Sequence, residues 1–155
     1  LDVKNLVKKG HAFTSNKDSN VLSTLDTNSI IHTDYLKLSP DENLEKLVDL
    51  ISHSNQVIFA VVSPEKKLLG IVHFNDIREI IFNSYRVKYT LIKDIMVKPI
   101  DIIYPTDSME TVMNKFEKTK VHFLPVTKNG DYFGFISKSF ALEAYRTKLK
   151  SMTIE

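Results

Sequence analysis

The sequence predicts an α+β or α/β fold built from two β-α-β-β-α repeats that pack against each other. Three observations lead to this prediction. The short apolar runs that would form the core occur twice, each pair of runs follows an amphipathic helical stripe, and the two copies keep a nearly constant spacing. A unit whose small sheet has an open face can bury that face against its twin, so two copies should fold together.

The spacing between the copies fixes their register. Equivalent residues are 65 apart over most of the unit, as in the pairs Ile30/Ile95, Pro40/Pro105 and Val61/Val126. After the turn of the hairpin the spacing falls to 64, which pairs Gly70 with Gly134, and a loop accepts such a length change at little cost. The predicted organisation is a lead-in at 1–28, repeat 1 at 29–90, repeat 2 at 91–147 and a tail at 148–155.

The lead-in segment is polar and weakly patterned. Its residues Val21, Leu22 and Leu25 are expected to form a short apolar turn that docks on the domain, without a long helix. In each repeat a short strand before Pro40 or Pro105 then leads to a helix whose apolar residues recur at i, i+3, i+4 and i+7. The two stripes are Leu44, Leu47, Val48 and Ile51, and Met109, Val112, Met113 and Phe116.

Helix caps and turns mark the ends of the predicted elements. Asn43 and Ser108 precede the two stripes and are good N-caps, because a short polar side chain can accept a hydrogen bond from a free amide of the first turn. The hairpin strands follow, at 57–62 and 68–72 and again at 121–126 and 132–136. Gly70 and Gly134 indicate close backbone approach. Asn75 and Ser139 are the expected caps of a second helix.

The composition excludes several classes of function. The 155 residues contain no cysteine, which excludes disulfides and thiolate chemistry, and the net charge of +2 is spread evenly, which does not favour nucleic-acid binding. No apolar run reaches the roughly 18 residues that a membrane span needs. The chain begins at Leu1 rather than Met, as expected of a piece of a longer protein or of a processed chain.

Catalytic and metal-binding patterns are also missing from the sequence. The chain has four glycines, which is too few for a Gly-rich phosphate loop, and no serine lies in a Gly-x-Ser-x-Gly elbow. The histidines have no metal-binding spacing; they are His11, His32, His53, His73 and His122. We therefore expect neither an enzyme nor a metal site.

The two copies resemble the paired cystathionine-β-synthase-type (CBS) domain, or Bateman module, over residues 29–147. The strings that carry the resemblance in the second copy are Ile92-Lys93-Asp94-Ile95-Met96, Pro105-Thr106-Asp107-Ser108-Met109, Phe123-Leu124-Pro125-Val126 and Gly134-Phe135-Ile136-Ser137. The flanking strings resemble the cytoplasmic C-terminal region of bacterial chloride channels and chloride/proton antiporters. They include Lys8-Lys9-Gly10-His11, Asp76-Ile77-Arg78-Glu79 and Tyr145-Arg146.

This resemblance implies two repeats related by a pseudo-twofold axis, with clefts that bind adenine nucleotides such as ATP, ADP or AMP. Asp76 matches the carboxylate that takes the ribose hydroxyls, although it could simply complement the start of its helix. Ser137 matches the phosphate-side hydroxyl, and its first-copy equivalent is His73, a ligand contact or a partly exposed polar residue. Phe140 replaces the carboxylate in the second copy, so we expect one nucleotide site at most.

The resemblance further implies a regulatory domain on the cytoplasmic side of the cell membrane. It would form a homodimer and serve the membrane-embedded channel or transporter domain of the same chain, without nucleic acid. Two alternatives remain at this point. The pair could be a structural dimerisation module that binds no ligand, or it could regulate another transporter or an enzyme.

Overall fold

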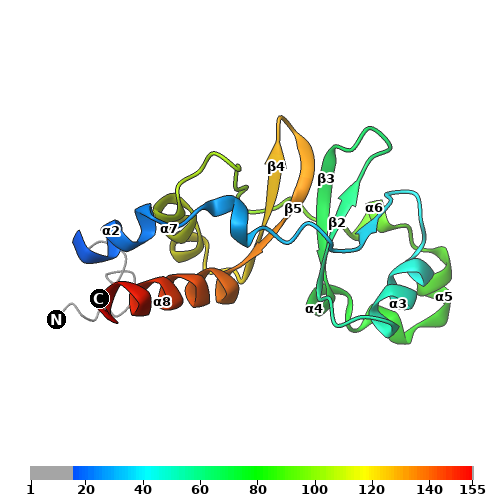
Figure 1. Ribbon diagram of the computed structural model, residues 1–155. Coiled ribbons are helices and arrows are strands. Elements are labelled where there is room, and N and C mark those ends of the chain that lie inside the picture. Colours follow the sequence, from blue (N-terminus) through cyan, green and yellow to red (C-terminus); the bar gives the residue numbers. More distant parts are fainter. Residues whose placement is uncertain (1–15, 155) are drawn as a thin grey trace. The chain divides into compact units, whose positions relative to one another are not determined.

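The computed structural model describes residues 16–154, which fall into two compact units (Figure 1). Unit 1 contains the described residues up to His32 together with Asp101–Val126 and the residues from Phe135 onward. Unit 2 contains Thr33–Ile100 and Thr127–Gly134. The expected lead-in lies partly outside the described residues, and so do the strings around Lys8 and His11.

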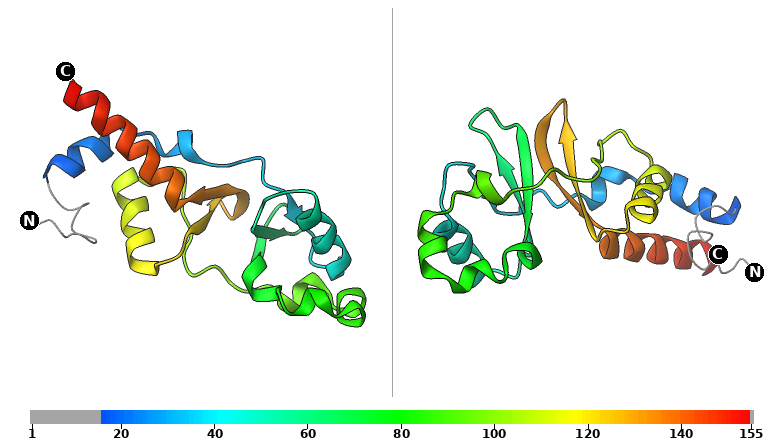
Figure 2. Two further views of the ribbon diagram at one scale, coloured as in Figure 1. Left: turned by 90° about the horizontal axis from the view of Figure 1, so that it is seen from below. Right: turned by 180° about the vertical axis from the view of Figure 1, so that it is seen from behind.

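Unit 2 is built on a three-stranded sheet in the order β1-β2-β3. The strands are β1 (Lys37–Leu38), β2 (Ile58–Val62) and β3 (Leu68–His73); β1 pairs with β2 in parallel and β2 with β3 antiparallel. Its helices are α3 (Leu44–Ser52), α4 (Phe74–Ile77), α5 (Ser84–Tyr89) and α6 (Ile92–Ile95), with a 3₁₀ turn, η4 (Ile80–Phe82), before α5. Helices α3 and α5 lie together on one side of the sheet (Figures 1 and 2).

Unit 1 combines three helices with the open end of the two-stranded hairpin of β4 (Phe123–Lys128) and β5 (Asp131–Ser137), whose turn end, Thr127–Gly134, belongs to unit 2. The helices are α2 (Asn16–Ser23), α7 (Met109–Thr119) and α8 (Lys138–Ile154), and a 3₁₀ turn, η3 (Thr27–Ile30), follows α2. The predicted docking of the lead-in is confirmed, because Leu22 is buried in the core that α7 and α8 form. The helix α8 continues to Ile154, through most of the segment expected to be a tail.

The predicted first helices and their caps are confirmed in both repeats. Asn43 Oδ1 accepts from the Glu45 backbone N–H at 3.0 Å, and Ser108 Oγ accepts from the Thr111 backbone N–H at 3.1 Å. Each helix buries the predicted face. The core residues of this face include Leu44 and Leu47 in unit 2 and Met109, Val112, Met113 and Phe116 in unit 1.

The two repeats exchange their first segments. His32 of repeat 1 exchanges both backbone hydrogen bonds with Phe135 in unit 1, and Val97 of repeat 2 does the same with Ile71 in unit 2. These bridges occupy equivalent positions in the register of the repeat. The side chains follow the same rule, since Ile30 lies in the core of unit 1 and Ile92 in the core of unit 2. Each packed unit therefore combines the leading segment of one repeat with the remainder of the other repeat.

Three predicted features of the repeats need correction. The first strand of repeat 2 is reduced to one parallel bridge, from Ile103 to Val126. The second helix of repeat 1 is broken into α4, η4 and α5, because the chain turns at Asn83, whose side chain caps α5 by accepting from Arg86 N–H at 3.1 Å. The second helices also begin earlier than expected, at Phe74 and Lys138, so neither Asn75 nor Ser139 is the cap.

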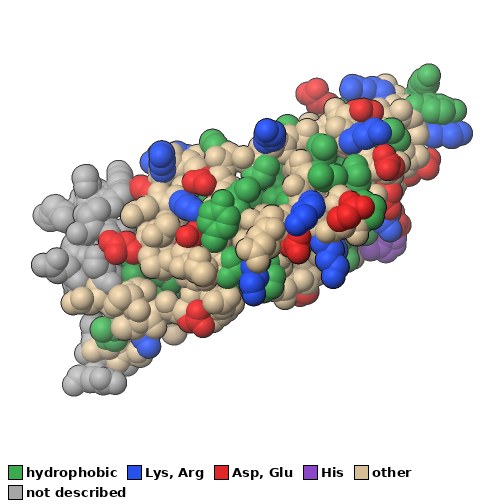
Figure 3. Space-filling model, turned by 90° about the horizontal axis from the view of Figure 1, so that it is seen from above, with side chains coloured by type: hydrophobic (Ala, Val, Ile, Leu, Met, Phe, Trp, Pro, Cys, Tyr) green, Lys and Arg blue, Asp and Glu red, His purple; other side chains and the backbone are tan. Residues whose placement is uncertain are grey.

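Gly70 confirms the expected close backbone approach. A Cβ atom at this position would lie 2.9 Å from Met96 Sδ and 3.1 Å from the carbonyl oxygen of Val97. On the face seen in Figure 3, the Lys and Arg side chains are interspersed with Asp and Glu, as the even distribution of charge in the sequence predicts. No helix in the described part of the chain combines the length and the apolar character needed to cross a membrane.

Candidate functional site

The first candidate region is the end of β3, where the strand passes directly into α4. His73 is the last residue of the strand and the N-cap of the helix, since its Nδ1 accepts a hydrogen bond from the Asn75 backbone N–H at 3.1 Å. The Phe74 N–H donates to the Val57 carbonyl at 2.8 Å, which ties this end of the strand to the start of β2. Asp76 follows in the first turn of α4, and its side chain is exposed.

A cation that the sequence reasoning missed lies in the same turn. Arg78 Nη2 donates to Asn75 Oδ1 at 2.6 Å, and its guanidinium carbon lies 5.5 Å from the centre of the Phe74 ring. Residues three apart on a helical turn share a face, so the spacing between Asn75 and Arg78 was the available signal. The strand end thus brings together an imidazole, an exposed carboxylate and an exposed guanidinium. Such a set can accept hydroxyl donors and donate to an anion.

Ser137 occupies the equivalent end of β5 in unit 1. It is only 7% exposed, and its Oγ accepts from the Phe140 backbone N–H at 3.2 Å, which makes it the cap of α8. The same oxygen lies 3.4 Å from His32 Nε2. Its hydroxyl is therefore engaged in local structure. The sequence reasoning missed His32, which its backbone bridge to Phe135 places beside this strand.

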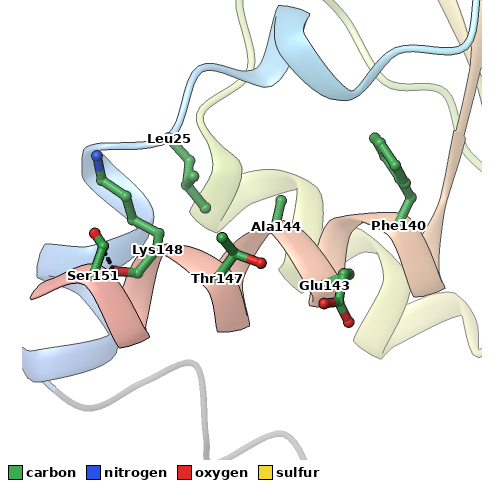
Figure 4. A pocket seen from close by; sticks show the side chains of 7 residues that line it. All are labelled: Leu25, Phe140, Glu143, Ala144, Thr147, Lys148 and Ser151. Carbon is green, nitrogen blue, oxygen red and sulfur yellow. Dashed lines mark hydrogen bonds between the residues drawn. The ribbon is translucent and has the colours of Figure 1, made fainter. Parts of the chain in front are cut away.

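Phe140 lies one helical turn further along, at the position equivalent to Asp76. Its ring centre is 4.9 Å from that of His32, and the ring is 46% exposed. Phe140 also borders a pocket of about 380 Å³ in unit 1 (Figure 4). The pocket lies between Leu25, in the turn after α2, and one face of α8, and its other lining residues are Glu143, Ala144, Thr147, Lys148 and Ser151.

The candidate residues thus form two separate sets. His73 and Asp76 lie together in unit 2, with Arg78, whereas Ser137 lies in unit 1 with His32 and Phe140. The two sets are chemically different although they occupy equivalent places in the repeat. Within residues 16–154, no group of three or more metal-ligating side chains converges on a point.

Comparison with known proteins identifies the repeats. The model of the CBS domain matches residues 28–83 and 92–139, which together exceed half of the chain. Among solved structures, CbpB in complex with c-di-AMP is 19% identical with a TM-score of 0.72, over 88% of this chain and 94% of that one. CBSX2 in complex with AMP is 16% identical with a TM-score of 0.68, over 79% and 96%.

Two further relatives come from a transporter and an enzyme. The CBS domain of the bacterial CNNM/CorC family Mg²⁺ transporter, in complex with ATP, is 14% identical with a TM-score of 0.73, over 83% of this chain and 92% of that one. These structural likenesses concern the fold. A homoserine O-acetyltransferase from Methanococcus vannielii is 28% identical over 120 residues, which are 77% of this chain but only 24% of that protein.

The match of the family model at both repeats agrees with the register of the sequence and with the paired bridges of the structure. Each repeat has the parallel contact, the hairpin and the capped helix at equivalent positions. The chain therefore belongs to the CBS-domain family and contains two CBS repeats.

Proposed function

We propose that this CBS pair is a regulatory module that binds an adenine nucleotide at the end of β3. The supporting observation is the set of side chains at the β3–α4 turn, where exposed Asp76 and Arg78 lie within one helical turn of each other. Three proteins of similar fold were solved with AMP, ATP or c-di-AMP bound, which supports the choice of ligand class.

Each side chain of this turn has a distinct role in the proposed site. The Asp76 carboxylate accepts the two ribose hydroxyls, because an ionised carboxylate can accept both donors at once. The Arg78 guanidinium donates to the phosphate, for which its planar array of N–H groups is suited. His73 positions both residues by holding the turn through its bond to the Asn75 N–H.

The second copy is proposed to contribute packing rather than a second nucleotide site. Phe140 stands where the ribose acceptor would be, and Ser137 is buried as a helix cap. For Ser137 to contact phosphate, its hydroxyl hydrogen would have to reach the ligand from a buried position beside His32, while the oxygen keeps its bond from the Phe140 N–H. The proposed site therefore consists of Asp76 and Arg78 as ligand contacts with His73 as the residue that positions them, and Ser137 is the weakest of the candidates.

Isothermal titration with AMP, ADP and ATP tests this site. Hydrogen bonds to a charged group are worth about 1.5 to 3 kcal/mol, so Asp76→Asn should weaken binding by roughly 10- to 100-fold. Glu79→Gln is the matched control, because Glu79 is an exposed acid in the same segment with the same charge change. Equal nucleotide affinity of the wild type and Asp76→Asn would contradict the assignment of Asp76 to the binding site. If the wild type binds none of the three nucleotides, a purely structural module is favoured.

The host protein is a separate part of the proposal. We propose a chloride channel or chloride transporter, with this pair as a homodimerising domain on the cytoplasmic side of the membrane, on the basis of the flanking strings around Asp76 and Tyr145. The match to the acetyltransferase favours a second candidate, in which the pair regulates an enzyme. The chain spans about a quarter of that relative. The coding sequence around this segment discriminates the two, since it encodes either several apolar spans or a catalytic domain.

Sedimentation equilibrium tests the dimer. The isolated 155-residue chain should sediment with twice the mass of the monomer at micromolar concentration. A strictly monomeric chain at high concentration would contradict the homodimer, whatever the titrations show.

A further inference from the structure

Three large aromatic side chains stand exposed along one short segment of unit 2. Phe82 is 83% exposed, Tyr85 64% and Tyr89 66%, and they lie at the end of η4 and on α5. Tyr85 and Tyr89 are four residues apart on α5 and share a face of that helix, and Phe82 precedes them at the end of η4. Tyr85 and Tyr89 touch edge to face, with ring centres 4.8 Å apart. We call Phe82, Tyr85 and Tyr89 the aromatic stripe.

The aromatic stripe is held in place but contributes little to the core. Asn83 caps α5 through its bond to Arg86 N–H, and Asn43 Nδ2 donates to the Lys88 carbonyl at 3.0 Å, so both ends of the helix are fixed. The inward side chain of α5 is Val87, which is buried in the core of unit 2. The rings of Tyr85 and Tyr89 therefore face outward on a fixed helix, and Phe82 is exposed immediately before it. Contiguous exposed apolar side chains on such a helix mark an interaction surface.

The charged side chains of the aromatic stripe's own helix are both basic. Arg86 and Lys88 are exposed on the same helix, and Lys88 Nζ lies 5.4 Å from the centre of the Tyr89 ring. The sequence has no acidic residue from Ile80 to Lys93. The nearby acids are Glu79, which is exposed before η4, and Glu45 on α3, whose carboxylate accepts from the neutral Asn43 amide and keeps its charge. The two cations on α5 itself nevertheless favour an anionic partner for the stripe.

We propose that the aromatic stripe docks unit 2 on an anionic lipid surface. Tyrosine suits the boundary between headgroups and acyl chains, because its ring is apolar and its hydroxyl is polar. Arg86 and Lys88 would then lie against lipid phosphates. A contact of the stripe with its counterpart in a second copy fits less well, since it would bring like charges together without an acid in the stripe to compensate them. The surface is separate from the β3 end, so its docking does not depend on nucleotide binding.

Co-sedimentation of the full 155-residue chain with vesicles tests the proposal. The chain should bind vesicles of phosphatidylcholine with phosphatidylglycerol, and it should bind pure phosphatidylcholine much more weakly. Each basic residue near an anionic surface contributes about fivefold to binding, so Arg86→Gln with Lys88→Gln should reduce it about 25-fold. The matched charge control is Lys118→Gln with Lys128→Gln, because both lysines are exposed outside the stripe. This control variant should bind the vesicles slightly more weakly than the wild type, because it loses only long-range electrostatic attraction to the anionic surface.

Substitution of the rings separates docking from general charge attraction. Phe82→Ser with Tyr85→Ser and Tyr89→Ser should abolish vesicle binding, whereas Phe133→Ser with Ile100→Ser, which changes exposed apolar residues elsewhere, should leave it intact. The chain has no tryptophan, so Tyr89→Trp provides a single reporter whose emission should shift to the blue on anionic vesicles. Unchanged thermal midpoints show that these variants fold.

Three results would overturn the proposal. The first is equal binding, or no binding, of the wild-type chain to both kinds of vesicle. The second is binding to anionic vesicles that survives loss of the three rings. The third is a dimer that dissociates when the rings are replaced, without any vesicle binding by the wild type, and this result would assign the aromatic stripe to a second copy.

Discussion

Lys115→Met should destabilise the chain more than the loss of an exposed ion pair does. Lys115 Nζ lies 2.8 Å from Asp107 Oδ2 and donates to the Ile102 carbonyl at 2.6 Å. The two charged side chains are only 19% and 17% exposed. Asp107 Oδ2 also accepts from the Tyr104 backbone N–H at 3.0 Å, so the pair fixes the loop that leads into α7.

The expected loss of stability follows from the burial of the ion pair rather than from the distance between its charged atoms. Breaking a fully buried pair costs about 3 to 5 kcal/mol, and the remaining exposure of this pair lowers the expected cost to about 2 to 3 kcal/mol. The pair of Lys67 and Asp131 in unit 2 is equally short, at 2.7 Å, but its side chains are 52% and 48% exposed. Water screens that pair, so Lys67→Met should cost at most about 1 kcal/mol.

Urea unfolding followed by circular dichroism measures both losses. The midpoint should fall clearly for Lys115→Met and little for Lys67→Met. A double-mutant cycle of Lys115→Met with Asp107→Asn should show a coupling energy of about 1 kcal/mol or more, because the two changes remove the same contact. Equal losses for the two lysines, or no coupling in the cycle, would refute the argument from burial.

Two further predictions concern unit 2. Gly70→Ala should cost about 1 to 3 kcal/mol in urea unfolding, because its Cβ would collide with Met96 and with the Val97 carbonyl; a neutral substitution, or no recovery when Met96→Ala is added, would contradict this reasoning. Burial, and then the neighbouring Tyr35 and Asp34, raise the pKa of Tyr132, so the unfolded chain loses this proton first as the pH rises. The free energy of unfolding should therefore be constant below about pH 10 and fall above it by up to about 1.4 kcal/mol per pH unit. In an alkaline titration Tyr132→Phe should make this fall smaller. An equal fall in the variant would show that Tyr132 is not its source.

The parts of the fold that the sequence predicted depend on local interactions. The caps Asn43 and Ser108 act on the next turn of their own helices, and the stripes behind them need only the period of the helix. One local hydrogen bond occurs in both repeats and was not predicted from the sequence. Glu42 accepts from the Ser39 N–H at 2.9 Å, and its equivalent Asp107 accepts from the Tyr104 N–H.

The exchange of leading segments could not be predicted, because it depends on pairing between distant residues. The spacing of 65 places Ile30 and Ile95 at equivalent positions, but it does not say which repeat each one packs against. The bridges of His32 with Phe135 and of Val97 with Ile71 decide this in the folded chain. The same limit explains why His32 was missed beside Ser137, since the two residues are far apart in the sequence.

The candidate site was predicted in part. The position of Asp76 in the first turn of a helix was predicted from sequence, and so was the equivalence of Asp76 with Phe140. The residues that cap these helices, His73 and Ser137, were not predicted. Both follow apolar runs and so are expected to be strand residues, and they act as caps because the helix begins directly after the strand. Arg78 was missed because its contacts with Asn75 and Phe74 depend on that same turn.

The two ends of the equivalent strands show how one backbone pattern acquires two roles. In repeat 1 the helix that follows the strand ends at Ile77, and the side chains of Asn75, Asp76 and Arg78 are exposed. In repeat 2 the serine cap is buried, the helix runs on for 17 residues, and the phenylalanine covers the histidine. Phe140 is itself 46% exposed, so the two positions differ in the type of side chain and not in their access to water. The proposed nucleotide response therefore fits repeat 1, because only repeat 1 has a charged acceptor, Asp76, at this position.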